Sequence, residues 1–235
     1  MKIPRMPHNW SLTPRQAIAI QKKLSSAVIR EGRPSEIRVA AGLDAAFTRD
    51  KKRCIGGVVL WDIFNKKVVE QHSALRELYF PYIPGLLSFR EAPALIAALR
   101  KLHSRPDLII CDGQGIAHPR RLGIACHIGL ITGLPAIGCA KSRLIGEYSE
   151  PGIRKGEMSP LRDRDELVGS VLRTRDNVKP VFVSVGHKIE LDAAVRIILD
   201  CAIGFRLPEP TRLADRLVAE RKKHFANLSD LKKIG

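Results

Sequence analysis

The chain has 235 residues, of which 45% are hydrophobic and 27% are charged, a balance typical of folded proteins rather than of disordered chains. Forty Lys and Arg residues against 24 Asp and Glu residues give a formal net charge of +16. A positive surplus of this size on a folded chain favours a polyanionic partner, most commonly nucleic acid. Only 5% of the residues are aromatic, which argues against a broad platform for base stacking.

The cysteines and the apolar segments exclude further classes of protein. The five cysteines include no C-x-x-C pair, which excludes a zinc ribbon and argues against a disulfide scaffold. The first ten residues include basic residues with no apolar segment behind them, so no signal peptide is expected. No stretch approaches 18 consecutive apolar residues, so no membrane span is expected. These features predict a cytoplasmic protein, with a monomer as the default assembly.

The first predicted element is a helix over residues 14–31. Thr13 is a favourable N-cap, Pro14 suits the first helical position, and Gly32 is placed to end the helix. Apolar residues recur in this segment at helical spacing, so the helix is expected to have one apolar face.

Three β-rich segments follow, separated by turns that contain charged residues or asparagine. They cover residues 37–47, 54–61 and 67–75. Their composition predicts strands, and the short connections between them favour antiparallel pairing. This part of the chain therefore predicts a three-stranded antiparallel meander.

Beyond residue 85 the pattern alternates between helices and strands. Helices are expected at 86–103 and 122–132, and strands at 107–112 and 135–140. Such alternation requires crossover connections and hence parallel pairing. After a polar excursion at 146–165, strands are expected at 166–174 and 181–185, and helices at 189–201 and 211–225, the last with Thr211 as its N-cap.

This order of elements defines the predicted fold class. Three antiparallel strands followed by parallel strands that alternate with helices is the order of a ribonuclease-H-like α/β domain. No internal repeat, low-complexity segment or interdomain linker is evident in the sequence. We therefore expect residues 1–235 to form a single domain, in which helices flank a mixed sheet.

Two aspartates lie where aspartate is unexpected. Asp44 interrupts the apolar segment 39–47, and Asp112 follows the apolar segment 108–111. Aspartate is depleted in strands and costly to bury without a partner, and ligands of α/β sheets bind outside the carboxyl ends of the strands. The structural alternatives are an Arg or Lys partner for Asp44 and an Asp-Gly turn at Asp112.

Glu91 has a strong structural alternative. Ser88-x-x-Glu91 fits a capping box, in which the glutamate only satisfies a backbone N–H group at a helix start. Together with Asp44 and Asp112, however, Glu91 can complete a trio of acids at one edge of the sheet. Three carboxylates gathered there would repel one another unless a hard cation neutralised them. The trio therefore predicts a Mg²⁺ site suited to hydrolysis of a phosphodiester.

The segments around these acids favour nucleic-acid binding. Pro81–Gly85 is a restricted loop from which Tyr82 can wedge into a base stack. Residues 113–123 follow Asp112 and supply glycines for close backbone contact and two arginines for phosphate. Lys141, just after the next strand, can meet a phosphate oxygen. The structural alternatives are a half-buried tyrosine that closes a helix and a solvated lysine.

These motifs together resemble the endonuclease V family. They are residues 39–47, Tyr82-Ile83-Pro84-Gly85 with Phe89-Arg90-Glu91, Asp112-Gly113-x-Gly115 with His118-Pro119-Arg120, and Gly138-Cys139-Ala140-Lys141. They occur in that family's order and span residues 44–141. Four linked motifs make the resemblance far more specific than any one of them.

The resemblance implies a ribonuclease-H-like, Mg²⁺-dependent endonuclease of DNA repair that recognises deaminated bases, chiefly hypoxanthine. Such enzymes hydrolyse the second phosphodiester bond on the 3′ side of the lesion and leave a 3′-hydroxyl and a 5′-phosphate. The implied metal ligands are Asp44, Glu91 and Asp112, and Lys141 and Asp215 complete the implied catalytic set. The implied nucleic-acid-binding residues, with Tyr82 as the wedge, are Tyr82, Pro84, Gly85, Leu87, Arg90, Gly113, His118, Arg120, Gly123 and Ile124.

Other functions remain as alternatives to this one. A non-catalytic nucleic-acid-binding protein with a nuclease-like fold is supported by the charge alone. A structure-specific nuclease of the same superfamily would act on flaps or junctions. Inosine-containing RNA is an alternative substrate to DNA, because the same chemistry serves both.

Overall fold

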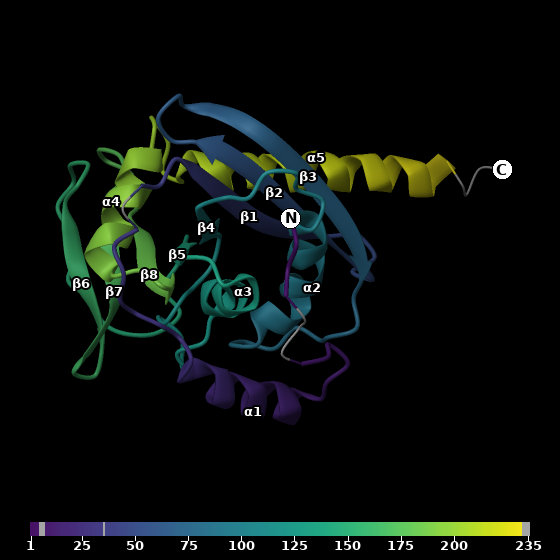
Figure 1. The fold of residues 1–235 in the computed structure, drawn as a ribbon, viewed down its shortest axis with the longest axis horizontal. Coiled ribbons are helices and arrows are strands. Elements are labelled where there is room, and N and C mark those ends of the chain that lie inside the picture. The colour runs from purple at the N-terminus through teal and green to yellow at the C-terminus, as the bar shows by residue number, and fades with distance from the viewer. Residues whose placement is uncertain (5–7, 35, 232–235) are drawn as a thin grey trace.

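The computed structural model describes residues 1–4, 8–34 and 36–231. These residues contain eight strands and five helices (Figure 1). The strands are β1 (Val39–Phe47), β2 (Arg53–Asp62), β3 (Lys67–Glu77), β4 (Leu108–Cys111), β5 (Ala136–Ala140), β6 (Met158–Asp163), β7 (Glu166–Leu172) and β8 (Val181–His187). The helices are α1 (Pro14–Ser25), α2 (Leu87–Leu99), α3 (Ile124–Thr132), α4 (Leu191–Cys201) and α5 (Glu209–Leu231).

The strands pair into one mixed sheet in the order β3-β2-β1-β4-β5-β8-β7-β6. Strands β1, β2 and β3 form the predicted antiparallel meander. Strand β4 lies parallel to β1, and β5 lies parallel to β4. Strand β8 is antiparallel to β5, and the hairpin of β6 and β7 completes the other edge. The predicted fold class, a mixed α/β sheet of the ribonuclease-H-like kind, is therefore confirmed.

Helices cover both faces of the sheet, as two adjacent glycines of β2 show. A Cβ atom at Gly56 would lie 2.4 Å from the backbone of Ala94 in α2. A Cβ atom at Gly57 would lie 2.6 Å from the side chain of Val218 in α5. Because successive side chains of a strand point to opposite faces, α2 and α5 pack on opposite sides of the sheet.

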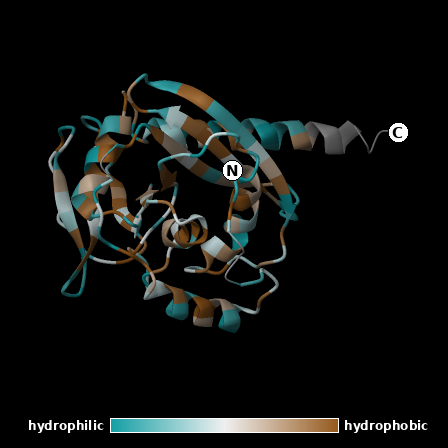
Figure 2. Cartoon of the chain, in the orientation of Figure 1, coloured by the Kyte–Doolittle hydropathy of each residue, from teal (hydrophilic) through white to brown (hydrophobic). Residues whose placement is uncertain are grey.

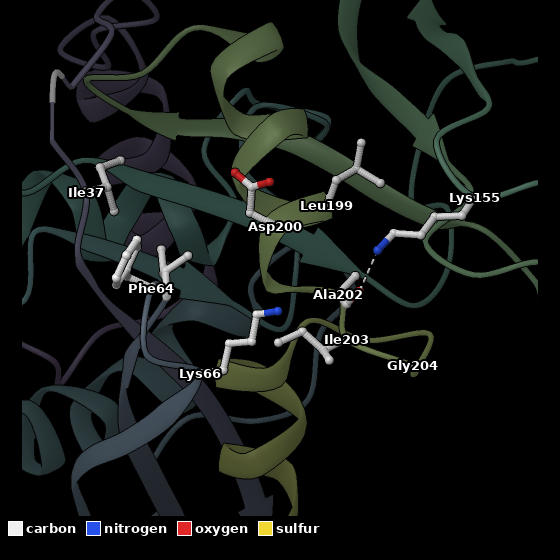
Figure 3. A pocket seen from close by; sticks show the side chains of 10 residues that line it. Ile37, Phe64, Lys66, Lys155, Leu199, Asp200, Ala202, Ile203 and Gly204 are labelled. Atoms are coloured by element: carbon white, nitrogen blue, oxygen red, sulfur yellow. Dashed lines mark hydrogen bonds between the residues drawn. The ribbon is translucent and has the colours of Figure 1, made fainter.

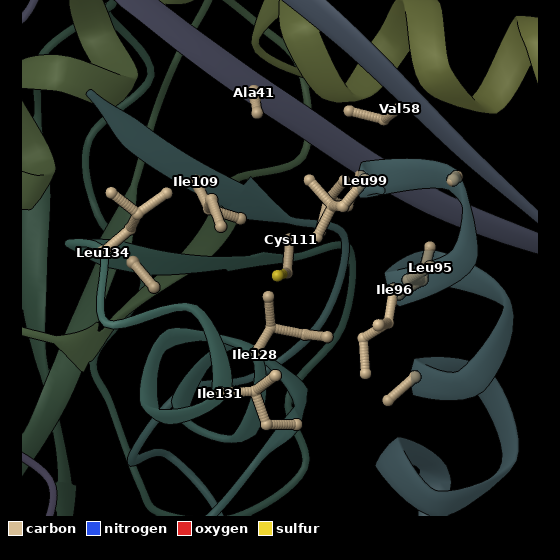
Figure 4. Close-up of a cluster of buried hydrophobic side chains, with 14 of the residues drawn as sticks. Ala41, Val58, Leu95, Ile96, Leu99, Ile109, Cys111, Ile128, Ile131 and Leu134 are labelled. Atoms are coloured by element: carbon tan, nitrogen blue, oxygen red, sulfur yellow. The ribbon is translucent and has the colours of Figure 1, made fainter. Parts of the chain in front are cut away.

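The main core lies between the sheet and helices α2 and α3 (Figure 4). Figure 2 shows hydrophobic residues in the central strands and in α3, and hydrophilic residues along α5 where it extends beyond the sheet. Burial of these aliphatic side chains holds both helices against the strands. The buried side chains labelled in Figure 4 are Ala41, Val58, Leu95, Ile96, Leu99, Ile109, Cys111, Ile128, Ile131 and Leu134.

All five cysteines are buried and free of disulfide bonds. Within the described ranges, no helix combines the length and the apolar character that a bilayer crossing requires.

Helix α1 begins as predicted but ends at Ser25 rather than at residue 31. Thr13 caps its start, and the N–H group of Gln16 donates to the Thr13 hydroxyl. Beyond the helix, the N–H group of Ile29 donates to Nδ1 of His187 at 3.2 Å, and its carbonyl accepts from the N–H group of Lys188 at 2.7 Å. These bonds to the end of β8 replace helical ones, so the chain leaves the helix early.

Helix α5 begins at Glu209, so the prediction of Thr211 as its N-cap is wrong. Thr211 lies buried in the first turn, where its hydroxyl donates to the carbonyl of Pro208 at 3.1 Å. Pro210 is acceptable in the first turn because the N–H groups there have no helical partner. The Glu209 carboxylate accepts two hydrogen bonds from the Arg212 guanidinium, which further fixes this helix start.

Gly42 of β1 provides a test of how α5 packs. A Cβ atom there would lie 2.0 Å from the backbone of Pro210, and no side-chain rotation relieves such a clash. We expect Gly42→Ala to lower the free energy of unfolding by about 3 kcal/mol, measured by urea denaturation. Gly57→Ala is the matched control, because its Cβ meets chiefly the movable Val218 side chain and should cost less. Equal losses in the two variants would contradict this packing.

Candidate metal and nucleic-acid site

Three carboxylates from distant parts of the chain converge at one end of the sheet. One carboxylate oxygen from each of Asp44, Asp112 and Asp215 lies within 4.8 Å of the other two. The parallel pairing of β1 with β4 explains the first two, because Leu43 pairs with Cys111 and each aspartate follows directly. Helix α5 supplies the third. The structure thus brings together the two aspartates that the strand pattern indicated and the one that the family resemblance added.

Glu91 acts on the same cluster from α2. Burial and the charges of the two strand aspartates raise its pKa to about 8. The capping-box alternative for this residue is wrong, since Leu86 is the N-cap of α2 and no side-chain cap bond is present there. The Ser88 hydroxyl instead hydrogen-bonds with Nδ1 of His127 at 3.0 Å. Glu91 therefore has no capping role. It interacts electrostatically with Asp44 and Asp112, although it is not one of the three acids whose oxygens lie within 4.8 Å of one another.

Lys141 is the cation that contacts this cluster directly. Its Nζ lies 2.6 Å from Oδ2 of Asp112 and 3.3 Å from Oδ1 of Asp215. Burial opposes the ammonium charge, but the hydrogen bond and charge of Asp112 raise the pKa of Lys141. Burial is also the main cause that raises the pKa of Asp112, and burial with the Asp112 charge raises that of Asp44. Among the described residues, Asp44 and Glu91 form no ion pair, so Lys141 alone would not balance the negative charge if all four acids were ionised.

This set of donors fits a hard divalent cation. All of the converging ligand atoms are carboxylate oxygens. Mg²⁺ and Ca²⁺ prefer oxygen ligands, whereas softer transition ions prefer nitrogen or sulfur ligands. A bound cation would also oppose the burial and the repulsion that raise the pKa values of Asp44, Glu91 and Asp112. Two of the three predicted metal ligands, Asp44 and Asp112, therefore lie close enough to share an ion with Asp215, and coordination by Glu91 stays a prediction.

A pocket of about 370 Å³ adjoins the carboxylates and shares Asp112 and Lys141 with them. Its walls come from the loop before α2, the segment after β4 and the first turn of α3. The pocket and the cluster therefore form one continuous site. Eight of the ten predicted nucleic-acid-binding residues line it, namely Tyr82, Pro84, Gly85, Leu87, Gly113, His118, Gly123 and Ile124.

The loop that carries Tyr82 is held at Gly85. This glycine has a φ of +77°, and its carbonyl oxygen accepts three side-chain hydrogen bonds. The donors are Nε2 of Gln21 at 2.9 Å, Nε2 of His118 at 2.9 Å and Nη2 of Arg120 at 2.7 Å. Burial lowers the pKa of His118 to about 4, so its ring is neutral at pH 7 and Nε2 carries the proton. The Tyr82 side chain itself is 70% exposed, so a fixed loop presents a free ring.

The other two predicted nucleic-acid-binding residues, Arg90 and Arg120, do not line the pocket. Besides its bond to the Tyr82 loop, Arg120 donates Nε–H to Oε1 of Gln21. Arg90 donates to the carbonyl of Phe80 at 3.0 Å, and its guanidinium lies 4.5 Å from the centre of the Phe47 ring. Both arginines brace the loop before α2 from within the protein. Contact of either with a phosphate stays a prediction.

Gln21 is the main residue of the site that the sequence did not indicate. It lies on α1, is 1% exposed, and lines the pocket although its helix is far from every motif in the sequence. Its Nε2 also donates to the carbonyl of Leu122 at 3.2 Å, so it joins two walls of the pocket. Its position in the sequence could have indicated a buried role. Gln21 lies one helical turn after the buried Ala17, and a polar residue on the apolar face of a helix needs buried hydrogen-bond partners. Ser142, Arg143 and Leu144 also line the pocket and were not predicted.

A larger hollow of about 690 Å³ lies elsewhere, between the turn that joins β2 to β3 and the segment after α4 (Figure 3). Phe64, Lys66 and Asp200 are among its lining residues, and the Lys155 ammonium donates to the carbonyl of Ala202 at 2.8 Å. Its lining contains a single carboxylate and no convergent set of ligand atoms. The smaller pocket beside the carboxylates is therefore the better candidate for function.

Comparison with known proteins finds similarity along most of the chain. The family profile described as Endonuclease V matches residues 22–216. The Endonuclease V of Nostoc sp. (strain PCC 7120) is 49% identical over 216 residues, which cover 92% of this chain and 98% of that protein. The Endonuclease V of Geotalea uraniireducens is 50% identical over 203 residues, which cover 86% of each.

Solved structures give the same result in three dimensions. The crystal structure of the Endonuclease V of Streptomyces avermitilis aligns with a TM-score of 0.88 and 42% identity, covering 94% of this chain and 98% of that one. The Endonuclease V of Ciona intestinalis, crystallised with a 24mer DNA that contains an inosine followed by a ribo-adenosine, aligns with a TM-score of 0.80 and 26% identity, covering 90% of this chain and 98% of that one.

The raised pKa of Glu91 predicts how stability depends on pH in the metal-free protein. A carboxyl whose pKa is raised on folding takes up a proton, so its contribution to stability is lost as pH rises from about 4.5 to about 8. We expect the free energy of unfolding, measured in chelator, to fall over this range. Glu91→Gln resembles the uncharged carboxyl and should be more stable than the wild type at pH 8 by about 2 kcal/mol. Identical pH slopes for both proteins would contradict the buried cluster.

Proposed function

The chain belongs to the endonuclease V family, and from this we propose that it is a Mg²⁺-dependent endonuclease of DNA repair that acts on deaminated bases. The preferred lesion is hypoxanthine, and the enzyme hydrolyses the second phosphodiester bond on its 3′ side, which leaves a 3′-hydroxyl and a 5′-phosphate. The observation that carries the proposal is the direct junction of the carboxylate cluster with the pocket. A metal-dependent nuclease needs metal ligands, and one that is specific for a lesion also needs a base pocket at a fixed distance from them.

The proposed Mg²⁺ ligands are Asp44, Glu91 and Asp112, with Asp215 as a further catalytic residue. When bound, Mg²⁺ supplies activation of the attacking water and stabilisation of the leaving oxygen. The carboxylates hold their charges at the end of the sheet, where the phosphate of the substrate has to lie. The Lys141 ammonium lies 2.6 Å from Asp112. When the substrate is bound, this ammonium is proposed to donate a hydrogen bond to a phosphate oxygen.

Base recognition is proposed to depend on the start of α3. Hypoxanthine presents a carbonyl oxygen at position 6, where adenine presents an amino group. The start of a helix carries a partial positive charge from its free N–H groups, which favours an acceptor over a donor. Gly123 and Ile124 bring this helix start into the pocket, and no side-chain cap bond is present at Gly123. The N–H groups of Gly123 and Ala125 already donate to backbone carbonyls, so the N–H group of Ile124 is the proposed donor to the base. A Cβ atom at Gly123 would lie 2.1 Å from the carbonyl oxygen of Gln114, so only glycine permits this approach.

Extrusion of the base is proposed to depend on Tyr82. An extruded nucleotide leaves a gap in the stack, and an inserted ring recovers part of the stacking energy. The three hydrogen bonds to the Gly85 carbonyl keep the loop rigid, so little ordering is required when the ring inserts. Weakened pairing at a deaminated base lowers the cost of extrusion and adds selectivity.

The binding partner of the protein and its cellular compartment are proposed on separate grounds. The net charge of +16 supports attraction to the nucleic-acid backbone and predicts binding that weakens with salt. DNA is proposed as the substrate because the Ciona intestinalis relative was crystallised with an inosine-containing DNA. We further propose that the protein acts in the cytoplasm as a monomer, with residues 1–235 as one catalytic domain.

Asp112→Asn tests the catalytic assignment. Loss of one carboxylate charge should reduce cleavage of an inosine-containing duplex in Mg²⁺ by more than about 100-fold, while much of the duplex binding should remain. Cleavage is measured on a gel beside the matched adenine duplex, with chelator as the metal-free reaction. Asp192→Asn is the control, because this aspartate is exposed on α4, away from the cluster. Full activity of Asp112→Asn, or cleavage by the wild type in chelator, would reject the metal assignment.

Tyr82→Ala tests the wedge. Loss of a stacking ring should weaken binding to an inosine-containing duplex by about 1–3 kcal/mol and change binding to undamaged duplex much less. Fluorescence anisotropy with the two labelled duplexes measures both affinities. Tyr79→Ala is the matched control, because Tyr79 is another exposed tyrosine just before the loop and does not line the pocket. An equal loss on both duplexes would rule out insertion at the lesion.

A further inference from the structure

A second cluster of metal-ligand side chains lies at the edge of the sheet. Glu70 and His72 are on β3, the strand at one end of the sheet, and His103 follows α2. One ligand atom from each of the three lies within 4.8 Å of the other two. We propose that Glu70, His72 and His103 bind a divalent transition ion of the Zn²⁺ class.

The fold explains why these three side chains meet. Glu70 and His72 are two residues apart on one strand, so their side chains point to the same face. They pair with Leu60 and Val58, which are buried in the core against α2, so this is the face that α2 covers. His103 comes from the turn at the end of that helix. Its ring centre lies 5.9 Å from that of His72.

Backbone groups already orient the carboxylate. The N–H group of His103 donates to Oε1 of Glu70 at 2.8 Å, and the N–H group of Ser104 donates to Oε2 at 3.1 Å. Nε2 of His72 also lies 2.7 Å from Oε1 of Glu70, so one imidazole already hydrogen-bonds with the carboxylate. These bonds account for Glu70 and His72, but they do not account for the His103 ring beside them. A carboxylate has about four lone-pair directions, so one remains beside these three bonds, and a bound ion would also replace the hydrogen bond from His72. Ligating carboxylates in metal sites are commonly held by hydrogen bonds in this way.

The donor set selects the class of ion. Two imidazoles and one carboxylate suit Zn²⁺ and similar ions and leave the fourth tetrahedral position to water, whereas Mg²⁺ prefers oxygen ligands alone. All five cysteines are buried, so no exposed thiol competes for such an ion. The Lys101 ammonium, which donates to the carbonyl of Ser73, is a positive charge near the site and will lower its affinity. A bound ion would join the edge strand to the end of α2, the helix that carries Glu91.

The test is a titration of the full chain, without an affinity tag, with Co²⁺ in saturating Mg²⁺. Excess Mg²⁺ occupies the carboxylate cluster, so added Co²⁺ reports on nitrogen-containing sites. We expect one equivalent of Co²⁺ to give the visible absorption bands of a four- or five-coordinate ion with nitrogen ligands, and Zn²⁺ to displace it. Zn²⁺ should also raise the thermal denaturation temperature of the wild type.

Three variants decide the assignment. His103→Ala removes an exposed ligand and should lower the affinity for Co²⁺ by more than about tenfold and abolish the thermal shift with Zn²⁺. His224→Ala, an exposed histidine on α5, should leave both measurements unchanged. A wild type without visible bands, or a His103→Ala protein that titrates like the wild type, would overturn the proposal. Loss of the bands in His8→Ala would also overturn the proposal. That result would assign the ion to His8 and His127, whose rings hydrogen-bond with each other.

Discussion

The burial of carboxyl groups close to one another at the end of β1 and β4 is the constraint on which the rest of the site depends. Asp44 and Asp112 are held together because the residues before them are paired in the sheet, and α5 adds Asp215. Burying like charges in this way costs free energy that hydrophobic packing elsewhere has to offset. The ammonium of Lys141 relieves part of the cost. A divalent cation would relieve more of it, and for this reason we propose the cluster as a metal site rather than as a structural ion pair.

Rigidity links this charge cluster to the pocket. Asp112 belongs to the cluster and the next residue, Gly113, lines the pocket, so one peptide unit joins the two. On the other wall, the Gly85 carbonyl is fixed by three donors that include Gln21 of α1. With both walls fixed to the sheet and its helices, a base in the pocket would place its backbone at a constant offset from the carboxylates. The proposed incision at one fixed bond beside the lesion would then follow from geometry rather than from recognition of sequence.

The sequence predicted the site residues whose type is unfavourable in the local secondary structure. An aspartate inside an apolar strand, such as Asp44, is locally unfavourable, so its presence indicates another role. Glu91 was ambiguous, because a capping box and a buried ligand place the same residue type at the same position in a helix. Gln21 and the early end of α1 were missed since both depend on partners far along the chain, the Gly85 carbonyl in one case and Lys188 in the other. Most of the sheet was predictable because strand length and connection length largely decide its pairing. Strand β6 was missed because it lies in the polar segment 146–165, where no strand was expected.

The most direct measurement of the central claim is anomalous diffraction from a crystal of the protein soaked in Mn²⁺, used as a substitute for Mg²⁺. The structure predicts an anomalous peak bonded to carboxylate oxygens of Asp44 and Asp112, about 2.0–2.3 Å away, with the Lys141 ammonium displaced from its contact with Asp112. A saturating soak that leaves Lys141 bridging Asp112 and Asp215, with no anomalous peak among the carboxylates, would contradict it.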